Sequence, residues 1–210
     1  MLDLSAEELL TTTRAVRKRL DFDRPVPKEL IEDCLRVAIQ APTGSNRQGW
    51  QFVAISDPER KLALADLYRR SWERYSAMPN PNYAEGDVRG ERMPHVRNSS
   101  QYLADRYHEA PWLMIPVIEG KPPRNSFEAG YWGSILPAFW SFMLAARARG
   151  LGTAWTTLHL EYEQEAAEVI GLPFERFTQA GMTPVAFYTG ETFKPAPRLP
   201  VESVMHWDGW

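Results

Sequence analysis

The sequence predicts an α+β fold built around one core, and three observations support this. Stretches with apolar residues at helical spacing are mixed with short apolar runs typical of strands, without a regular β-α-β alternation. In a chain of 210 residues, a hydrophobic content of 44% is enough for a sizeable core. The chain has no internal repeat, heptad pattern or low-complexity tract, so we expect a single domain over residues 1–210.

The first half is expected to contain three helices and one strand. Ser5 and Glu8 make a capping box, which predicts the start of the first helix. Pro27 suits the first turn of a second helix, because a proline there loses no helical hydrogen bond. The expected elements are a helix of about two turns after Ser5, a helix from Pro27 to Pro42, a strand over Trp50–Ser56 and a helix from Asp57 to about Tyr75.

The second half is expected to be richer in strands. The expected elements are a strand over Trp112–Ile118, a helix from about Glu128 to Arg149, a strand over Gly152–Leu158, a helix over Glu161–Ile170 and a strand over Met182–Thr189. The helix that begins near Glu128 carries aromatic residues on several sides, so it must be covered most of the way round. We interpret it as the centre of a subunit interface, and a core helix within one subunit is the alternative.

Composition excludes several classes of function. The net charge is −3 and the basic residues form no extended stripe, so neither nucleic acid nor a membrane surface is an expected partner. One cysteine, Cys34, and an N-terminus without signal-peptide features predict a reducing, cytoplasmic location. The longest apolar stretch is interrupted by Pro137 and is too short to span a membrane. The four histidines lack metal-ligand spacing, so no metal site is expected.

The loop from Ala41 to Trp50 has the composition of a ligand-binding loop. Its small residues let a ligand approach the backbone, Asn46 and Gln48 bring amide donors and acceptors, and Trp50 offers an aromatic wall. The alternative is an ordinary helix-to-strand turn in which Trp50 opens a core strand.

Four basic residues lie within six positions from Arg14 to Arg19. Two arginines three apart, Arg14 and Arg17, can converge on one phosphate if the backbone is helical or turns there. The alternative is a solvated basic face beside Asp21 and Asp23.

Together these two stretches resemble the flavin-dependent nitroreductase family, in which a short arginine motif precedes a Pro-Ser-Ser-x-Asn-x-Gln-Pro-Trp loop by roughly thirty residues. The resemblance extends through the segments 127–157 and 195–204. It implies a nitroreductase-like fold, with a central and mostly antiparallel sheet surrounded by helices, in an intertwined homodimer. This chain departs from the pattern at Ala15, where a serine is usual, at Thr43-Gly44 in place of paired serines, and at Gly49 in place of proline.

The resemblance also implies FMN as the cofactor, bound at the subunit interface. The implied cofactor-binding residues are Arg14, Ala15, Arg17, Pro42, Thr43, Gly44, Asn46, Gln48, Thr156, Thr157 and Arg198. Among them, the arginines would hold the phosphate, the Pro42–Gln48 loop would come from the neighbouring subunit, and a main-chain N–H near Thr156 would face flavin N5. No catalytic side chain is expected, because the flavin carries the electrons.

The implied activity is ping-pong oxidoreduction. NADH or NADPH would reduce the flavin, and a flat acceptor such as a nitroaromatic or a quinone would then take the electrons. Two alternatives remain open: a non-catalytic protein that binds or sequesters FMN, and another flavin reaction on the same scaffold, such as reductive dehalogenation or flavin breakdown.

Two segments complete the expected organisation. Residues 75–110 contain recurring tyrosines and methionines, and Gly86 and Gly90 are expected to break regular structure, which suits a lid over a flat ligand. We expect Tyr83 and Tyr102 from this segment, together with Trp50, to contact the substrate. Residues 191–210 are Pro-rich at their start and are expected to form an extended arm.

Overall fold

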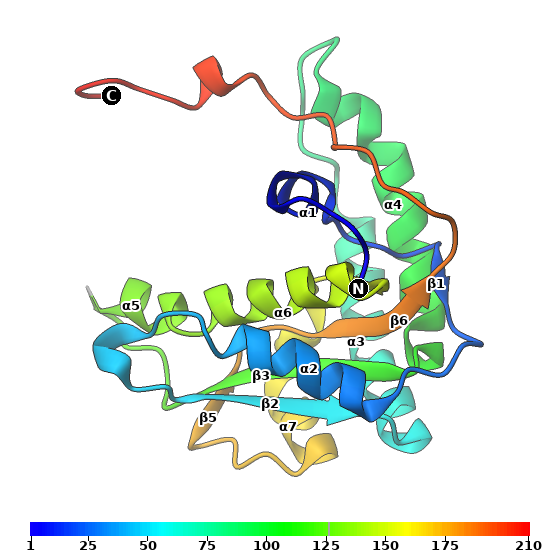
Figure 1. Ribbon diagram of the computed structural model, residues 1–210, viewed down its shortest axis with the longest axis vertical. Coiled ribbons are helices and arrows are strands. Elements are labelled where there is room, and N and C mark those ends of the chain that lie inside the picture. Colours follow the sequence, from blue (N-terminus) through cyan, green and yellow to red (C-terminus); the bar gives the residue numbers. More distant parts are fainter. Residues whose placement is uncertain (126) are drawn as a thin grey trace.

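A six-stranded sheet forms the centre of the molecule in the computed structural model, which describes residues 1–125 and 127–210 (Figure 1). Its main path runs β1 (Leu20–Asp21), β6 (Thr183–Tyr188), β3 (Trp112–Glu119) and β2 (Trp50–Ile55), while β4 (Leu151–Thr153) pairs with β6 and β5 (Phe177–Gln179) pairs with β3. All of these pairings are antiparallel. The expected class, an antiparallel sheet surrounded by helices, is therefore confirmed.

Among the residues that the structure describes, seven α-helices surround this sheet. They are α1 (Ala6–Thr12), α2 (Lys28–Ala38), α3 (Pro58–Ala77), α4 (Val88–Arg106), α5 (Glu128–Gly133), α6 (Leu136–Ala148) and α7 (Glu163–Ile170). The expected capping box is present, since the Ser5 hydroxyl accepts from the Glu8 N–H and the Glu8 carboxylate accepts from the Ser5 N–H. The side chain of Asp57 caps α3 in a similar way.

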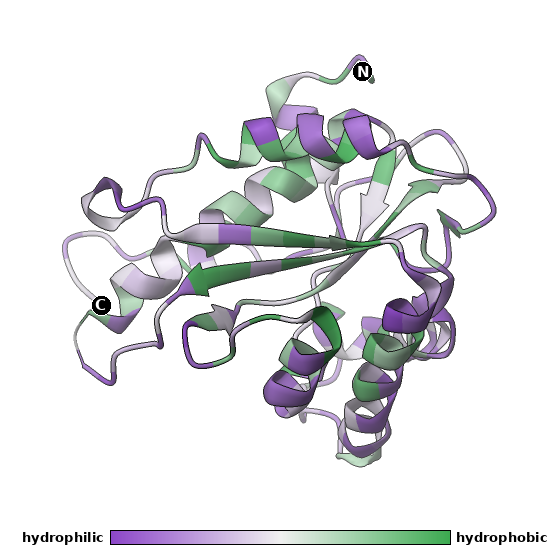
Figure 2. Cartoon of the chain, turned by 90° about the horizontal axis from the view of Figure 1, so that it is seen from below, coloured by the Kyte–Doolittle hydropathy of each residue, from purple (hydrophilic) through white to green (hydrophobic). Residues whose placement is uncertain are grey.

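The sheet is buried on both faces, and Figure 2 shows helices on both sides of it. Along β3, Leu113, Ile115 and Val117 pack in the cluster that contains residues of α3, α4 and α7, whereas Met114 packs in the cluster formed with α2 and α6. This alternation follows from the period of two residues in a strand. Strand β3 consequently contributes side chains to two hydrophobic clusters, one on each face of the sheet.

The long helix expected from Glu128 to Arg149 is in fact two helices. The α5 helix ends at Gly133 and α6 begins at Leu136, with Pro137 in its first turn. Proline has no N–H and its ring clashes with the carbonyl four residues earlier, so an uninterrupted helix cannot pass this point without a kink. Phe139 and Phe142 of α6 are fully buried within this chain, as the core-helix alternative requires.

The strand expected over Gly152–Leu158 is also shorter than predicted. Pairing with β6 ends at Thr153, Thr156 makes only an isolated bridge with Met182, and a 3₁₀ turn occupies Leu158–Tyr162. The backbone turns away from the sheet at this point, and α7 accordingly begins at Glu163 rather than Glu161.

Helix α4 was not predicted from the sequence, because Gly86 and Gly90 were expected to break regular structure. In the structure only the residues between α3 and α4 are irregular, and Gly90 and Pro94 both lie inside α4. The Asp87 side chain caps the first turn, and Leu103 and Ala104 bury the far end against α3 and β3. Capping and burial thus outweigh the helix-breaking residues.

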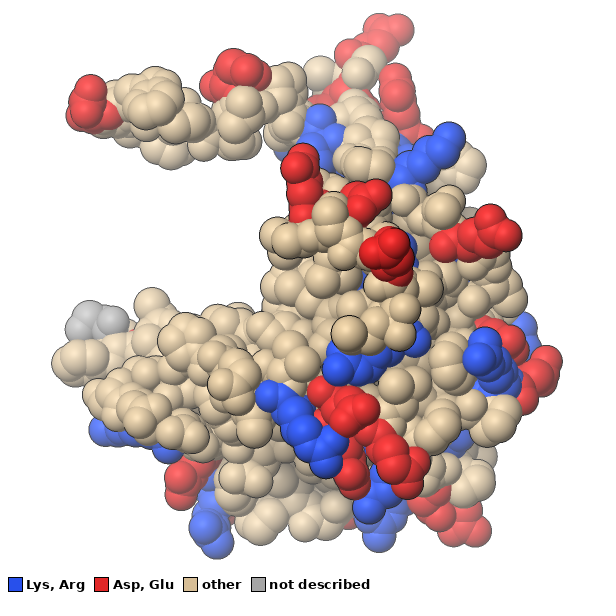
Figure 3. All heavy atoms as spheres, viewed as in Figure 1, with Lys and Arg blue, Asp and Glu red and all other residues tan. Residues whose placement is uncertain are grey.

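The C-terminal arm, residues 191–210, first runs back along the molecule, where Phe193 packs on a core cluster and Lys194 accepts from Arg14. In Figures 1 and 3 the outer part of this arm stands off from α5 and α6 across an open gap whose lining is largely uncharged. Its exposed residues include Val201, Val204, Trp207 and Trp210. Within the part of the chain that the structure describes, no helix has both the length and the apolar character needed to cross a membrane.

Candidate functional site

The segment Arg14–Arg17, which we name the arginine motif, packs closely against β4. Val16 is buried, and its N–H donates to the carbonyl of Thr153 at 2.8 Å. A Cβ added to Gly152 would lie 2.8 Å from Leu20 Cδ2 and 3.0 Å from Val16 Cβ, which is too close for any side chain. Glycine at position 152 therefore allows the segment that carries Arg14 and Arg17 to pack directly on the sheet.

Beside this crossing lies a cavity of about 430 Å³, which we name the basic hollow. It is formed by the arginine motif, one face of α4 and the C-terminal arm. Its lining residues are Arg14, Ala15, Arg17, Lys18, Arg92, His95, Val96, Asn98, Ser99, Ala196 and Arg198. The lining contains five Lys and Arg side chains and no Asp or Glu. In a chain of net negative charge, this local excess favours an anionic ligand.

The electrostatics of Arg14 reflect this crowding. Partial burial lowers the pKa of Arg14, and the positive charges of Arg92, Arg198 and Arg19 lower it further. A bound anion would relieve this repulsion.

The basic side chains of the hollow bond only to neutral oxygens among the described residues. Arg14 donates to the carbonyl of Lys194 at 3.1 Å, and Arg17 lies 3.5 Å from the Ser99 hydroxyl. Lys18 donates to the Asn98 side chain. Arg198 donates to the neighbouring carbonyl of Pro197 at 3.1 Å. Because none of these acceptors is charged, the cations remain available for a phosphate.

A second cavity of about 480 Å³, the aromatic cleft, adjoins the basic hollow. Arg17 and Val96 line both cavities, so the two lie side by side and share part of their walls. Large apolar and aromatic side chains make up much of the cleft: Tyr68, Trp72, Tyr75, Met78, Met93 and Trp155. This combination of a cationic end and a flat, aromatic-lined end suits a ligand that has both a phosphate and a ring system.

Thr156 and Thr157 both line the cleft, but they offer different groups to it. The Thr156 N–H donates to the carbonyl of Met182 at 2.9 Å, and its hydroxyl bonds to the same carbonyl and to the buried Tyr107 hydroxyl. Thr157 is exposed, and its N–H has no acceptor among the described residues. Thr157 is thus the better candidate for a main-chain donor to a ligand.

Buried tyrosines support this part of the cleft. The rings of Tyr68 and Tyr107 lie 4.7 Å apart. Burial raises the pKa of Tyr68 to about 12, although the Arg17 charge opposes this shift. Burial likewise lowers the pKa of Arg17, while Tyr68 and Tyr107 counteract that effect. Tyr107 therefore connects the neighbourhood of Arg17 with Thr156.

The Pro42–Gln48 loop lies elsewhere in this chain. Figure 1 shows the segment between α2 and β2 beside α5, at the opposite end of the molecule from β1 and α4. Gly44 N–H donates to the Ser134 hydroxyl at 2.9 Å, and neither Pro42, Thr43, Gly44, Asn46 nor Gln48 lines the hollow or the cleft. A single chain therefore brings together only part of the predicted cofactor set: Arg14, Ala15, Arg17, Thr156, Thr157 and Arg198.

The loop has a strained backbone. Ser45, Asn46 and Gln48 have φ values of 53°, 52° and 50°, in the left-handed region that residues with a side chain rarely adopt. Gln48 stabilises this shape by donating from its side chain to Asn46 Oδ1 at 2.9 Å and from its N–H to Thr43 Oγ1 at 3.1 Å. Such strain in an exposed loop is typical of functional segments.

The predicted substrate residues are placed less favourably. Trp50 is only 8% exposed and packs in a core cluster with Ile118 and Ile135, so it opens a core strand and cannot line the cleft. Local sequence does not reveal this, because an aromatic residue at the end of a loop suits a ligand wall as well as a core.

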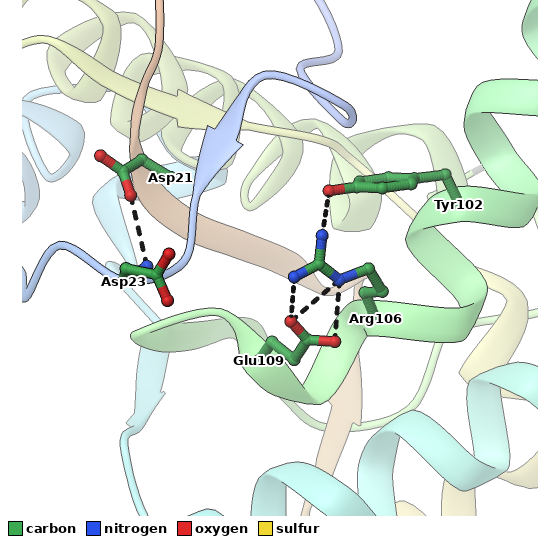
Figure 4. Close-up of polar contacts among 5 residues, drawn as sticks. All are labelled: Asp21, Asp23, Tyr102, Arg106 and Glu109. Atoms are coloured by element: carbon green, nitrogen blue, oxygen red, sulfur yellow. Dashed lines mark hydrogen bonds and ion pairs between the residues drawn. The ribbon is translucent and has the colours of Figure 1, made fainter.

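Tyr102 faces away from the cleft. Its hydroxyl accepts from Arg106, which is also paired with Glu109 (Figure 4). The Arg89 guanidinium lies over the ring of Tyr83, with Cζ of Arg89 4.9 Å from the centre of that ring. Tyr83 lines a shallower depression that shares Asn80, Pro81 and Met93 with the aromatic cleft. Of the three predicted substrate residues, Tyr83 alone remains near the cleft.

Several residues of the two cavities escaped the sequence analysis. Arg92 and Ser99 come from α4, and Trp72 comes from α3. Recognition of α4 as a helix would have placed Arg92, Val96 and Ser99 on one face, at spacings of four and three residues. The structure shows no cluster of three or more metal-ligating side chains among the residues it describes.

Comparison with known proteins places this geometry in context. The model of the nitroreductase family matches residues 10–187. The chain is 29% identical to the chloronitrobenzene nitroreductase of Comamonas testosteroni, over 79% of this chain and 80% of that protein. Among solved structures, an iodotyrosine deiodinase bound to FMN and 3-iodo-L-tyrosine aligns with a TM-score of 0.76 and 22% identity, covering 97% of this chain and 99% of the other. The FMN and NADPH-dependent nitroreductase NfnB from sphigopyxis sp. strain HMH aligns with a TM-score of 0.69 and 23% identity, covering 99% and 100%.

Proposed function

The chain belongs to the nitroreductase family, and from this premise we propose that it is an FMN-dependent enzyme that uses NAD(P)H to reduce flat acceptors such as nitroaromatics and quinones. Family membership supports flavin-dependent oxidoreduction as the general activity. The observation that carries the specific proposal is that the basic hollow and the aromatic cleft lie side by side and share Arg17 and Val96 in their linings. A flavin mononucleotide has matching parts, a phosphate dianion and a planar ring.

The residues of the two cavities fit FMN. Arg14, Arg17 and Arg198 would hold the phosphate, because the hollow lacks carboxylates and the Arg14 pKa is already lowered by neighbouring cations. Ala15 lacks the hydroxyl that is usual in the family. Ser99 supplies a hydroxyl to the same hollow from α4, and it would take over that role.

The aromatic cleft would hold the isoalloxazine ring, with the Thr157 N–H as a main-chain donor at its edge. Bound there, FMN would supply the chemistry of hydride and electron transfer between the reduced nicotinamide and the second substrate. The protein binds and orients the ring, and the apolar walls exclude water from it.

We further propose that the partner subunit completes the site. Pro42, Thr43, Gly44, Asn46 and Gln48 lie too far from the hollow to reach a flavin in their own chain. In a homodimer they would contact the flavin that the other subunit holds. The exposed arm would then cover a partner surface instead of solvent.

Flavin binding is the first test. Purified protein should contain about one FMN per chain, and it should bind FMN more tightly than riboflavin because only FMN carries the phosphate. Arg14→Ala should weaken FMN about ten- to a hundredfold, since each charge-assisted hydrogen bond contributes roughly 1.5–3 kcal/mol, and it should leave riboflavin binding nearly unchanged. Arg60→Ala, in the exposed first turn of α3, is the matched control.

Two outcomes of the binding test would contradict the proposal. Protein that gains no flavin absorbance on incubation with FMN does not have the site. Equal losses for FMN and riboflavin in Arg14→Ala would show that Arg14 acts through folding rather than through the phosphate.

Turnover is the second test. Oxidation of NADH or NADPH should depend on added nitroaromatic or quinone, and initial rates should give the parallel double-reciprocal lines of ping-pong kinetics. 3-Iodotyrosine should be tested as an acceptor beside the nitroaromatics and quinones, because a structural neighbour binds that compound. If FMN binds but neither nicotinamide is oxidised with any acceptor, the protein only holds FMN.

A further inference from the structure

The basic hollow contains more positive charge than one flavin phosphate can neutralise. Arg14, Arg17, Lys18, Arg92 and Arg198 together carry five positive charges. A phosphate monoester carries at most about two negative charges at neutral pH. The three arginines assigned above to the FMN phosphate already exceed its charge, so Lys18 and Arg92 are left without an anionic partner.

Arg92 is the more informative of these two residues. It lies in the second turn of α4 and lines the hollow, where its charge acts on Arg14, and its side chain makes no ion pair or hydrogen bond among the described residues. Its neighbours on the same helix all have another contact: Arg89 pairs with Asp87, and Arg97 donates to the carbonyls of Ser76 and Met78. A partly buried guanidinium without a partner favours an anionic ligand.

Helix α4 also connects this charge to the ring-binding end. Met93, the residue after Arg92, lines the aromatic cleft, and Val96 lines both cavities. An extended ligand whose flat ring lies in the cleft can therefore follow α4 from Met93 to Arg92 and place a distant phosphate in the hollow. The electron donor is such a ligand, because its nicotinamide has to enter the cleft.

We propose that Arg92 and Lys18 bind the 2′-phosphate of NADPH and make NADPH the preferred electron donor; this inference rests on the function proposed above. NADPH differs from NADH only by that monoester. A terminal phosphate has three free oxygens and suits a compact group of converging cations. In the pyrophosphate, which both donors share, each phosphorus has only two free oxygens and one negative charge, so its charge is less concentrated than that of the terminal monoester.

Anaerobic reduction of the bound flavin by NADPH and by NADH, measured in single turnovers, tests this inference. The wild-type protein should favour NADPH by about tenfold or more in the second-order rate constant, as expected for one or two charge-assisted contacts. Arg92→Gln should lower this ratio about tenfold, by weakening NADPH binding rather than the limiting rate of reduction. Arg92→Lys, which keeps the charge but loses the planar fork, should retain part of the preference.

Arg89→Gln is the matched control, because Arg89 lies one turn earlier on α4 and is paired with Asp87 outside the hollow. This variant should leave the ratio of the second-order rate constants for NADPH and NADH unchanged. FMN affinity, measured in parallel, should be the same in Arg92→Gln as in the wild type. Adenosine 2′,5′-bisphosphate should bind the flavin-loaded protein more tightly than adenosine 5′-monophosphate or inorganic phosphate, and Arg92→Gln should remove that difference.

Three results would overturn the inference. The first is equal reduction by the two donors. The second is an equal loss for both donors in Arg92→Gln, which would assign the residue to the shared pyrophosphate. The third is weaker FMN binding in Arg92→Gln with riboflavin unaffected, which would assign Arg92 to the flavin phosphate. Failure of both donors to reduce the flavin would instead contradict the proposed function, and the adenosine bisphosphate measurement would still decide whether a 2′-phosphate is bound.

Discussion

His159 is a fully buried titratable side chain close to the cleft. It follows Leu158 in the 3₁₀ turn after Thr157, and neither of its ring nitrogens has a well-aligned hydrogen-bond partner among the described residues. Burial lowers the pKa of His159 to about 4, and the neighbouring Gln179 side chain offsets only part of that shift. The folded protein thus keeps this imidazole neutral at pH values where an unfolded chain would protonate it.

The sign of the pH effect follows directly. The unfolded chain takes up a proton at His159 below its ordinary pKa of 6.5, while the folded protein does not until about pH 4, so stability falls as the pH drops through this window. Between pH 7 and pH 5 the loss from this residue should be on the order of 2 kcal/mol. Denaturant unfolding of the wild type and of His159→Gln at both pH values measures it as the difference between the two proteins. If the free energy of unfolding changed with pH equally in the two proteins, His159 would not contribute to the pH dependence of stability.

At the scale of elements, the connection between α3 and α4 is held by one side chain. Arg97 of α4 donates to the carbonyls of Ser76 and Met78 at 2.9 and 2.8 Å, and this fixes the start of the irregular segment over residues 78–87. Met78, Asn80 and Pro81 of that segment line the cleft. The lid predicted over residues 75–110 is therefore best proposed as this shorter segment, with α4 as its support.

Limited proteolysis tests that proposal. The first cut should fall within residues 78–87, because helical backbone in α3 and α4 resists cleavage. Arg97→Ala should speed this cut several-fold, and a flat aromatic inhibitor that occupies the cleft should slow it. Arg60→Ala, at the opposite end of α3, should have no effect. First cleavage inside α4 would contradict the assignment.

The same elements show how far sequence reasoning reaches. The capping box at Ser5 and the cap at Asp57 depend on a few neighbouring residues, so the starts of α1 and α3 could be predicted. Helix α4 depends on burial of Leu103 and Ala104 by distant parts of the chain, which local sequence does not contain.

For the site, the arginine motif and Arg198 could be identified from their resemblance to a family, and the structure brings them to one cavity. Arg92 and Ser99 could not, because their place in the hollow depends on the unpredicted helix. The burial of Trp50 could not be predicted for a related reason: its pairing opposite Ile118 in the sheet, rather than its neighbours in sequence, decides that it is buried.

At the scale of the whole molecule, the exposed arm and the distant loop both predict an obligate homodimer. The arm presents Trp207 at 80% exposure and Val204 at 63%, which is costly for apolar side chains unless another surface covers them. The dimer should bury on the order of 2,000–5,000 Å², as permanent dimers do. Sedimentation should give twice the chain mass, and deletion of residues 199–210 should weaken both dimerisation and FMN binding. A monomer that binds FMN with full affinity would contradict the prediction.

The separation of the Pro42–Gln48 loop from the arginine motif predicts that two variants of the chain can complement each other. If each flavin contacts the motif of one chain and the loop of the other, a chain with Arg14→Ala and a chain with Asn46→Ala can complement each other, since their heterodimer has one doubly altered site and one intact site. Equal amounts refolded together give about half heterodimers and so about a quarter of intact sites. At an FMN concentration that leaves both single variants empty, the mixture should recover that share of bound flavin. A mixture that stays empty would mean that loop and motif serve the same flavin within one chain.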